Sequence, residues 1–164
     1  MKELQLTQGY VALVDDEDYE RVNQYKWHTS INRKVVYAKR TVYNKQTGCR
    51  AQMLHRFILS ISDSTPIDHI DHNGLNNQRE NLRVVTCRQN SQNQKLSVDN
   101  TSGFKGVTWY RPGNYWRSFI WDGDRNVYLG GFSDPYNAAK AYDKAAIKCH
   151  GEFACTNASL GLLP

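Results

Sequence analysis

The stretch from Asp68 to Asn90 contains the side chains of this chain that are best suited to chemistry. It holds two histidines, two aspartates and five asparagines, a density of polar groups that a stretch serving only a hydrophobic core does not need. An imidazole that is neutral near pH 7 can take a proton from water, and a carboxylate beside it can hold a hard cation through oxygen. These residue types therefore predict a ligand or metal site.

Asp68 and His69 are adjacent on a predicted strand, so their side chains point to opposite faces of it. They cannot both bind one ion from the same side. This arrangement predicts a division of labour in which Asp68 binds a metal ion and His69 reaches the attacking water. Asn81, at the end of a polar loop, and Asn90, on a predicted helix, add amide oxygens. We expect the helix to close the site.

The elements that position these residues are expected in the order strand, polar loop, strand and helix. The strands are predicted at 66–71 and 82–85. The run 72–80 lacks an apolar period and is rich in Asn, Gly and Gln, which predicts a loop stabilised by side-chain to backbone hydrogen bonds. Thr86 precedes Gln89 by three positions, and this capping-box pattern predicts a helix from about residue 87 to residue 95.

Upstream of this stretch the sequence predicts two helical segments and a hairpin. Residues 9–15 read as a short apolar strand, and the acidic residues that follow suit the start of a helix ending near Tyr25. Residues 35–43 alternate in polarity as a strand does, with 50–53 as the hairpin partner across a turn. Residues 54–61 carry apolar side chains at helical spacing.

Charge is distributed unevenly along the chain. The formal net charge of +5 and the pI near 9.0 are compatible with a polyanionic partner. Between Ile31 and Ser62 there is no acidic residue, and the basic residues of this segment are Arg33, Lys34, Lys39, Arg40, Lys45, Arg50 and Arg56. We expect the segment to bind DNA backbone, with Arg40 and Arg56 among its phosphate contacts. His55 and Arg56 either brace the site and contact phosphate, or cap the core of the first domain.

From residue 103 the sequence predicts a second domain. Strands rich in aromatic and β-branched residues are expected at 103–109, 115–121 and 126–132. Asp134 and Pro135 suit the start of a helix whose apolar stripe is rich in alanine, and Gly151 suits its left-handed end. The predicted division is a domain at 1–95 with its core at about 66–95, a linker at 96–102, a domain at 103–158 and a tail at 159–164.

Composition adds that the chain should fold and keep its thiols free. The hydrophobic share of 40% and the aromatic share of 12% are enough for folded cores. The four cysteines form no C-x-x-C pair, so neither a zinc ribbon nor a redox motif is indicated. The sequence contains no signal peptide and no apolar run that could span a bilayer, which predicts a cytoplasmic protein with no membrane partner.

The pattern D-H-I-D-H-N-G-L-N-N-Q-R-E-N-L-R-V-V-T followed by Q-N, with M-L-H-R upstream, resembles the HNH family of nucleases and its ββα-metal unit. The resemblance implies that Asp68 is the first metal ligand and His69 the general base. It also implies that Asn81 holds the histidine and the loop in place. Asn90 matches the last ligand, here an amide where many members have histidine. Oxygen ligands alone favour Mg²⁺ or Mn²⁺ over zinc.

Residues 103–157 resemble the Apetala-two/ERF DNA-binding domain through F-K-G-V, W-R-S-F-I, Y-L-G-G-F, A-A-K-A-Y-D-K-A-A-I-K and G-E-F-A-C-T-N. That family lays a three-stranded sheet into the major groove. The resemblance implies DNA contacts by Lys105, Thr108, Tyr110, Phe119, Trp121, Asn126 and Tyr128. Arg111, Arg117 and Arg125 could touch phosphates, and Trp116 is either core or contact. Several positions that are arginine in the plant proteins are apolar or aromatic here, which predicts weaker salt dependence.

Together the two resemblances imply an α+β chain: a mixed α/β segment leading into a ββα-metal unit, then a separate three-stranded antiparallel sheet on one helix. They imply a metal-dependent endonuclease that nicks double-stranded DNA at a target site as a monomer or weak dimer. Such homing-type enzymes occur in bacteria and their phages. Two alternatives are a non-catalytic DNA-binding regulator that retains the HNH scaffold, and a structure-selective or RNA-directed nuclease whose aromatic sheet stacks unpaired bases.

Overall fold

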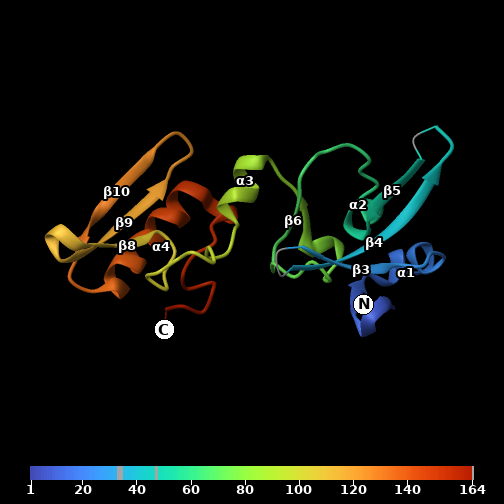
Figure 1. Cartoon of the computed structure of the whole chain (residues 1–164), viewed down its shortest axis with the longest axis horizontal. Helices are drawn as coiled ribbons and strands as arrows, with labels where there is room; N and C mark the ends of the chain where they lie inside the picture. Colours follow the sequence, from blue (N-terminus) through green and yellow to red (C-terminus); the bar gives the residue numbers. More distant parts are fainter. Residues whose placement is uncertain (33–34, 47, 164) are drawn as a thin grey trace. The chain divides into compact units, whose positions relative to one another are not determined.

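The computed structural model describes residues 1–32, 35–46 and 48–163 (Figure 1). The chain is α+β, with several small antiparallel sheets and few helices. It divides into two compact units, Met1–Thr86 and the part that begins at Cys87, and each is described by itself. Arg33 and Lys34 of the basic segment lie outside the described residues. No helix in the described ranges is long and apolar enough to cross a membrane.

The first unit begins with a hairpin that was only half predicted. Strand β1 (Lys2–Gln5) pairs antiparallel with β2 (Val11–Val14) across the short 3-10 helix η1 (Thr7–Gly9), and helix α1 (Asp16–Asn23) follows. β1 is largely polar and buries only Leu4, so its sequence carries no strand pattern. Asp15 stands at the N-cap of α1 but makes no side-chain cap, because its carboxylate accepts hydrogen bonds from Gln78 Nε2 and the Arg79 amide.

A three-stranded sheet completes the scaffold of the first unit. It consists of β3 (His28–Asn32), β4 (Val35–Asn44) and β5 (Gly48–Met53), with β4 in the centre, and helix α2 (Leu54–Ile58) follows β5. β4 and α2 share one core with the first hairpin, α1 and the strand β7 (Leu82–Val84). Its buried residues are Leu4, Ala12, Val14, Val22, Trp27, Ala38, Leu54, Ile58 and Leu82.

Two short strands and a long polar loop form the rest of the first unit. β6 (Ile67–His69) pairs antiparallel with β7, and η2 (Arg79–Asn81) leads into β7. The loop between them is attached to β2, because the Leu13 amide donates to Leu75 O at 2.8 Å and the Asn77 amide donates to Leu13 O at 2.8 Å. Gly74 lies so close to β4 that a Cβ there would be 2.5 Å from Val36 O.

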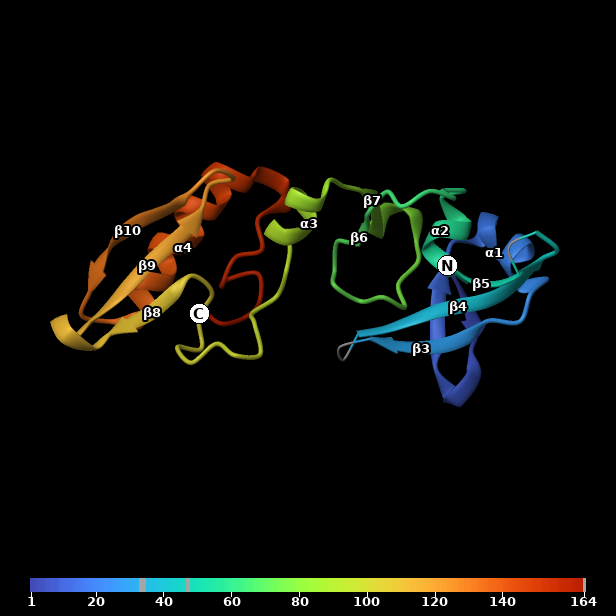
Figure 2. The same ribbon diagram turned by 45° about the horizontal axis from the view of Figure 1, so that its top comes forward.

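The second unit is a three-stranded antiparallel sheet packed on one long helix. Helix α3 (Cys87–Gln92) comes first, followed by β8 (Val107–Tyr110), η3 (Arg111–Gly113), β9 (Tyr115–Trp121), β10 (Asn126–Phe132), α4 (Pro135–His150) and η4 (Gly151–Phe153). β9 is the central strand, and α4 lies along one face of the sheet (Figure 2). Ala138, Ala139 and Ala146 of α4 are fully buried, as expected of small residues that allow close helix–sheet packing.

A buried polar network fixes the last segment of the second unit to the start of the sheet. The carboxylate of Asp143, on α4, accepts hydrogen bonds from Asn157 N at 2.7 Å, Asn157 Nδ2 at 2.8 Å and Ala158 N at 2.9 Å. Asn157 has no exposed surface, and its Oδ1 accepts from the Lys105 amide at 2.6 Å. Three segments distant in sequence therefore depend on one carboxylate.

Several predicted element boundaries were wrong, each for a local reason. β8 begins at Val107 rather than at residue 103, because Gly103 and Gly106 have positive φ values of 77° and 74°. Helix α2 ends at Ile58 rather than at residue 61, because Ser60 has a φ of 56°, which is incompatible with a right-handed helix. The strand β3 was not predicted. The predicted domain limits and the linker at 96–102 stay predictions.

Candidate active site

Asp68 and His69 occupy the end of β6, where the antiparallel partner β7 places Arg83 and Leu82 opposite them. Both polar side chains are buried, with 8% of Asp68 and 6% of His69 exposed. The register puts Arg83 on the same side of the ribbon as Asp68, and its guanidinium donates to Asp68 Oδ2 from Nε at 3.0 Å and from Nη2 at 2.9 Å. The opposite strand therefore holds Asp68, while the side chain of His69 points to the other face of β6.

His69 lies in a cluster of rings contributed by three elements of the first unit. The His55 ring, from α2, is 5.1 Å from the His69 ring at an interplanar angle of 88°. The Tyr37 ring, from β4, is 5.8 Å from His69 and 6.1 Å from His55. His69 Nε2 is buried and has no hydrogen-bond partner within the described part of the chain. An unpartnered buried imidazole nitrogen is unusual in a purely structural site.

Burial determines the charge of both imidazoles. It lowers the pKa of His69, an effect that the nearby Asn77 amide and the carboxylates of Asp71 and Asp68 only partly offset. Burial also lowers the pKa of His55, to about 3, with further contributions from His69 and Arg56. Both rings are consequently neutral at pH 7, and a neutral imidazole can accept a proton.

The loop after His69 is held in one conformation by Asn81. The Asn81 side chain accepts from the Asp71 amide at 3.0 Å and donates to Asp71 Oδ1 at 2.9 Å and Asn76 O at 2.8 Å, while its own carbonyl accepts from the Ile70 amide. Asp71 and Asn73 each accept a bond from the amide two residues on, at 2.8 Å and 3.1 Å. The prediction of a loop stabilised by side-chain to backbone bonds is confirmed.

Charged residues around the site brace its strands. Arg56 donates from Nη1 to Asp63 O at 2.7 Å and from Nη2 to Thr65 O at 2.6 Å, and so supports the segment that enters β6. Arg79 of η2 bonds Asp18 of α1 through Nε at 2.7 Å. Of the two readings left open for Arg56, these contacts favour bracing, and its phosphate contact stays a prediction.

The donor set at β6 fits a hard divalent cation. Asp68 offers carboxylate oxygen, and oxygen ligands are those that Mg²⁺ and Mn²⁺ prefer while keeping several waters. Asn90, the other predicted ligand, lies on α3 at the start of the second unit, and its role stays a prediction. Within the described ranges no group of three or more His, Cys, Asp and Glu side chains comes together as a metal cluster.

Sequence reasoning did not connect Tyr37 or His55 with His69. The M-L-H-R segment leaves the role of His55 open, and residues 35–43, which include Tyr37, show only the alternation of a strand. The signal that could have linked them is the polarity of β4, on which Tyr37 lies on the opposite face from the core residue Ala38. Nothing in the sequence gives the spacing between that face and β6.

The buried neutral state of His55 predicts that stability falls in mild acid. The unfolded chain takes up a proton near pH 6.5, whereas folded His55 does so only near pH 3, so acid favours unfolding across that window. At about 1.4 kcal/mol per unit, His55 alone should remove about 2 kcal/mol by pH 5. Urea denaturation at pH 7.5 and 5 measures this loss. In His55→Phe the free energy of unfolding should depend less steeply on pH. An unchanged dependence would refute this prediction.

The predicted DNA-binding residues of the sheet share one face of the second unit. Register pairs Thr108 with Arg117, Phe119 with Tyr128, and Trp121 with Asn126, and this face lies opposite the one that packs on α4. Arg117 extends over the Tyr110 ring at 4.1 Å. Half of Trp121 and half of Tyr128 are exposed, at 51% and 52%. Their DNA contacts stay predictions, supported by this common exposed face.

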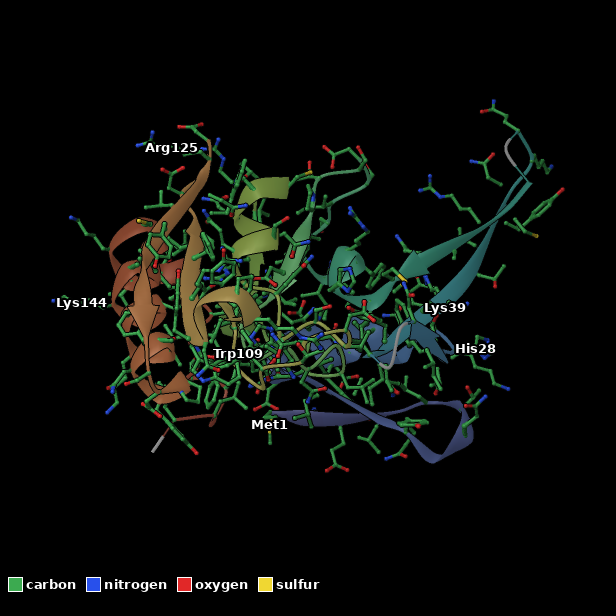
Figure 3. The ribbon with its side chains drawn as sticks, turned by 60° about the vertical axis from the view of Figure 1, so that its left-hand side comes forward. Met1, His28, Lys39, Trp109, Arg125 and Lys144 are labelled. Atoms are coloured by element: carbon green, nitrogen blue, oxygen red, sulfur yellow. The ribbon has the colours of Figure 1, made fainter. Side chains whose placement is uncertain are left out.

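Other aromatic and basic residues of the second unit have different surroundings. Trp116 packs on the core formed with α4 and meets Trp109, which Figure 3 labels, edge to face with ring centroids 4.9 Å apart. Lys105 is turned to α3, where its ammonium donates to Gln92 O at 3.1 Å and Gln94 O at 2.6 Å. Arg125 is exposed at the tip of the β9–β10 hairpin (Figure 3). DNA contact by Lys105 stays a prediction.

Arg40, the candidate phosphate contact of the basic segment, is engaged in the first unit. Its guanidinium stacks on the Tyr25 ring at 3.6 Å and lies 4.6 Å from the Phe57 ring. Its Nε donates to Gln52 Oε1 at 2.8 Å. The opposite face of β4 carries Lys39, which pairs in register with His28 of β3, and both are labelled in Figure 3. A DNA contact by Arg40 stays a prediction.

Comparison with known proteins finds two kinds of relative. A family model described as HNH endonuclease matches residues 63–92. An uncharacterised HNH endonuclease of Acanthamoeba polyphaga mimivirus is 34% identical over 155 residues, which are 91% of this chain and 75% of the viral protein. The APETALA2-like protein 2 of Oryza sativa is 50% identical over 60 residues, 37% of this chain and 14% of the plant protein. Protein 3.8 of Escherichia phage T7 is 44% identical over 54 residues, 33% of this chain and 45% of the phage protein.

Proposed function

The chain belongs to the HNH endonuclease family, and from this premise we propose that it is a metal-dependent DNA endonuclease that nicks one strand at a target site. The observation that carries the proposal is the end of β6, where the buried carboxylate of Asp68 adjoins the buried imidazole of His69. A carboxylate for a cation and a neutral base for water are the two groups that hydrolysis of a phosphodiester needs.

Each residue of the site has a role that its surroundings support. His69 takes a proton from the attacking water, since burial keeps its imidazole neutral at pH 7. Asn81 positions the loop that follows His69, through its three side-chain bonds to Asp71 and Asn76. Asp68 and Asn90 would hold Mg²⁺ or Mn²⁺. When bound, this ion supplies charge stabilisation for the transition state and the leaving oxygen.

The second unit would dock the nuclease on its target. Its exposed sheet face combines aromatic rings with one guanidinium, that of Arg117, and APETALA2-like relatives match part of the chain. A three-stranded sheet can enter the major groove, and aromatic side chains there contact thymine methyl groups. The basic segment of the first unit would hold the backbone near the cut without reading bases. One catalytic site per chain then nicks rather than breaks the duplex, in the manner of homing-type enzymes.

Purified protein should convert a supercoiled plasmid to the open circular form in Mg²⁺ or Mn²⁺, because each nick relaxes the circle. Chelation with EDTA should stop the conversion, and returning the ion should restore it. Agarose electrophoresis follows both steps, and sequencing across the nick locates it. Metal-independent cutting would contradict the proposal.

The exposed aromatic face of the second unit favours one other substrate, unpaired bases, which stack on such rings. A single-stranded DNA circle run beside the plasmid separates the two substrates. Preferential cutting of the single-stranded circle would replace the duplex target in the proposed function.

A further inference from the structure

Arg83 is the counter-ion of the carboxylate that we assign to the metal ion. The two residues are direct partners across β6 and β7, so the sheet itself brings their side chains together. Both the Nε and the Nη2 of Arg83 donate to one oxygen, Oδ2 of Asp68. The Arg83 side chain is 15% exposed and that of Asp68 9%, which makes this an interior ion pair with little screening by solvent.

The other groups near this pair add little negative charge for a cation. Asp71 is committed to the loop, where it accepts bonds from the Asn73 amide, Asn76 Nδ2 and Asn81 Nδ2. Asn81 itself is neutral. A divalent ion that approaches Asp68 in the first unit therefore meets a carboxylate whose charge Arg83 already balances.

Resting on the proposed function, we propose that Arg83 makes metal binding depend on DNA. It is a positioning residue that fixes the Asp68 carboxylate through Oδ2 and weakens the attraction of the free protein for Mg²⁺ or Mn²⁺. A phosphate of bound DNA supplies the missing negative charge, and phosphate oxygens are usual partners of Mg²⁺ beside one or two carboxylates. The coupling is reciprocal, so the ion strengthens DNA binding by the same factor.

The alternative role for Arg83 is purely structural, and the two roles predict opposite effects on metal affinity. A residue that only stabilises the strand pair would, when removed, loosen Asp68 and weaken or leave unchanged its binding of the ion. A counter-ion would, when removed, strengthen that binding. Arg83→Lys separates the effect of charge from that of geometry, because lysine keeps the charge but lacks the planar fork of donors.

The test measures binding of Mn²⁺ to the full-length chain through the electron paramagnetic resonance signal of the free ion. The titration is run without DNA and with a mixed-sequence duplex longer than one helical turn, the latter in a His69→Ala background so that the duplex stays intact. Arg83→Gln is compared with Lys144→Gln, which removes a positive charge from an exposed position on α4, away from the proposed DNA-binding face of the sheet. Circular dichroism establishes that each variant is folded.

In the parent protein, which keeps Arg83, we expect the duplex to tighten Mn²⁺ binding about tenfold. One neighbouring charge changes the affinity of a carboxylate for a cation such as the proton on this scale. Arg83→Gln should tighten Mn²⁺ binding without DNA about tenfold and lose most of the gain from the duplex, whereas Lys144→Gln should match the parent. Arg83→Lys should lie between parent and Arg83→Gln, and this expectation stands even if Arg83→Gln fails to fold.

The role of Arg83 would be overturned if Arg83→Gln weakened Mn²⁺ binding or left it unchanged. It would also be overturned if the duplex tightened Mn²⁺ binding equally in all folded variants. That outcome leaves the proposed function intact if the wild-type chain nicks plasmid. Failure of the proposed function looks different. In that case Asp68→Asn would bind Mn²⁺ as tightly as the parent and no metal-dependent nick would form, which overturns the inference as well.

Discussion

His69→Ala should abolish nicking while the protein still binds DNA within a few-fold of wild type. The imidazole is buried and neutral next to Asp68, and we propose it as the general base; removing a general base costs about 10²–10⁴ in rate. DNA affinity should persist because the basic segment and the exposed sheet face, which would supply the contacts, are untouched. Initial rates on supercoiled plasmid, set beside electrophoretic mobility shifts with the same DNA, measure both quantities.

His72→Ala is the matched control for this prediction. His72 lies three residues along the same stretch, on the partly exposed loop, with a positive φ of 60°. Its loss removes an imidazole of the same chemistry from the same stretch, but from a partly exposed position, whereas His69 is buried. We expect its nicking rate to remain within a few-fold of wild type. Comparable nicking by His69→Ala and His72→Ala would disprove the assignment of the base.

Asp143→Ala should unfold the second unit under conditions in which the first unit stays folded. The substitution strands the Asn157 and Ala158 amides and the Asn157 side-chain amide in the interior, without their acceptor. Removing a charged acceptor from a buried hydrogen-bond network lowers the free energy of unfolding by about 3–5 kcal/mol. This is a large part of the stability of a small domain. DNA docking should be lost with the sheet.

Urea denaturation followed by circular dichroism tests this prediction, and Asp134→Ala provides a control. Asp134 also accepts a backbone hydrogen bond, from the Asn137 amide at 2.9 Å, but at the partly exposed start of α4. Loss of such a helix cap costs only about 1 kcal/mol. If the two variants unfold at the same urea concentration, the network around Asn157 does not hold the unit together.

The ββ portion of the site could be predicted from the sequence because its information is local. Asp68 and His69 are neighbours on one strand, and the Asn-rich run between β6 and β7 encodes its own turns through side-chain to backbone bonds. The strands β9 and β10 and the helix α4 were also correctly located, since their aromatic, β-branched and alanine patterns are long enough to be read.

The features that the sequence did not reveal depend on contacts between distant segments. β3 is a polar strand that exists because β4 pairs with it, so its own residues carry no alternating pattern. Helix α3 ends at Gln92 rather than near residue 95, and Lys105 binds the carbonyls at that end from a position 13 residues away. The approach of His55 and Tyr37 to His69 is likewise set by packing of α2 and β4.

The bonds of Asn81 have a further consequence for the way the enzyme meets its substrate. A loop held by three side-chain bonds, and attached to β2 through Leu13, is already ordered when no ligand is bound. The conformational entropy of this loop is therefore lost during folding rather than at the encounter with DNA. Binding energy from the DNA contacts need not be spent on ordering residues 70–78, and it remains available for distortion of the substrate toward the transition state.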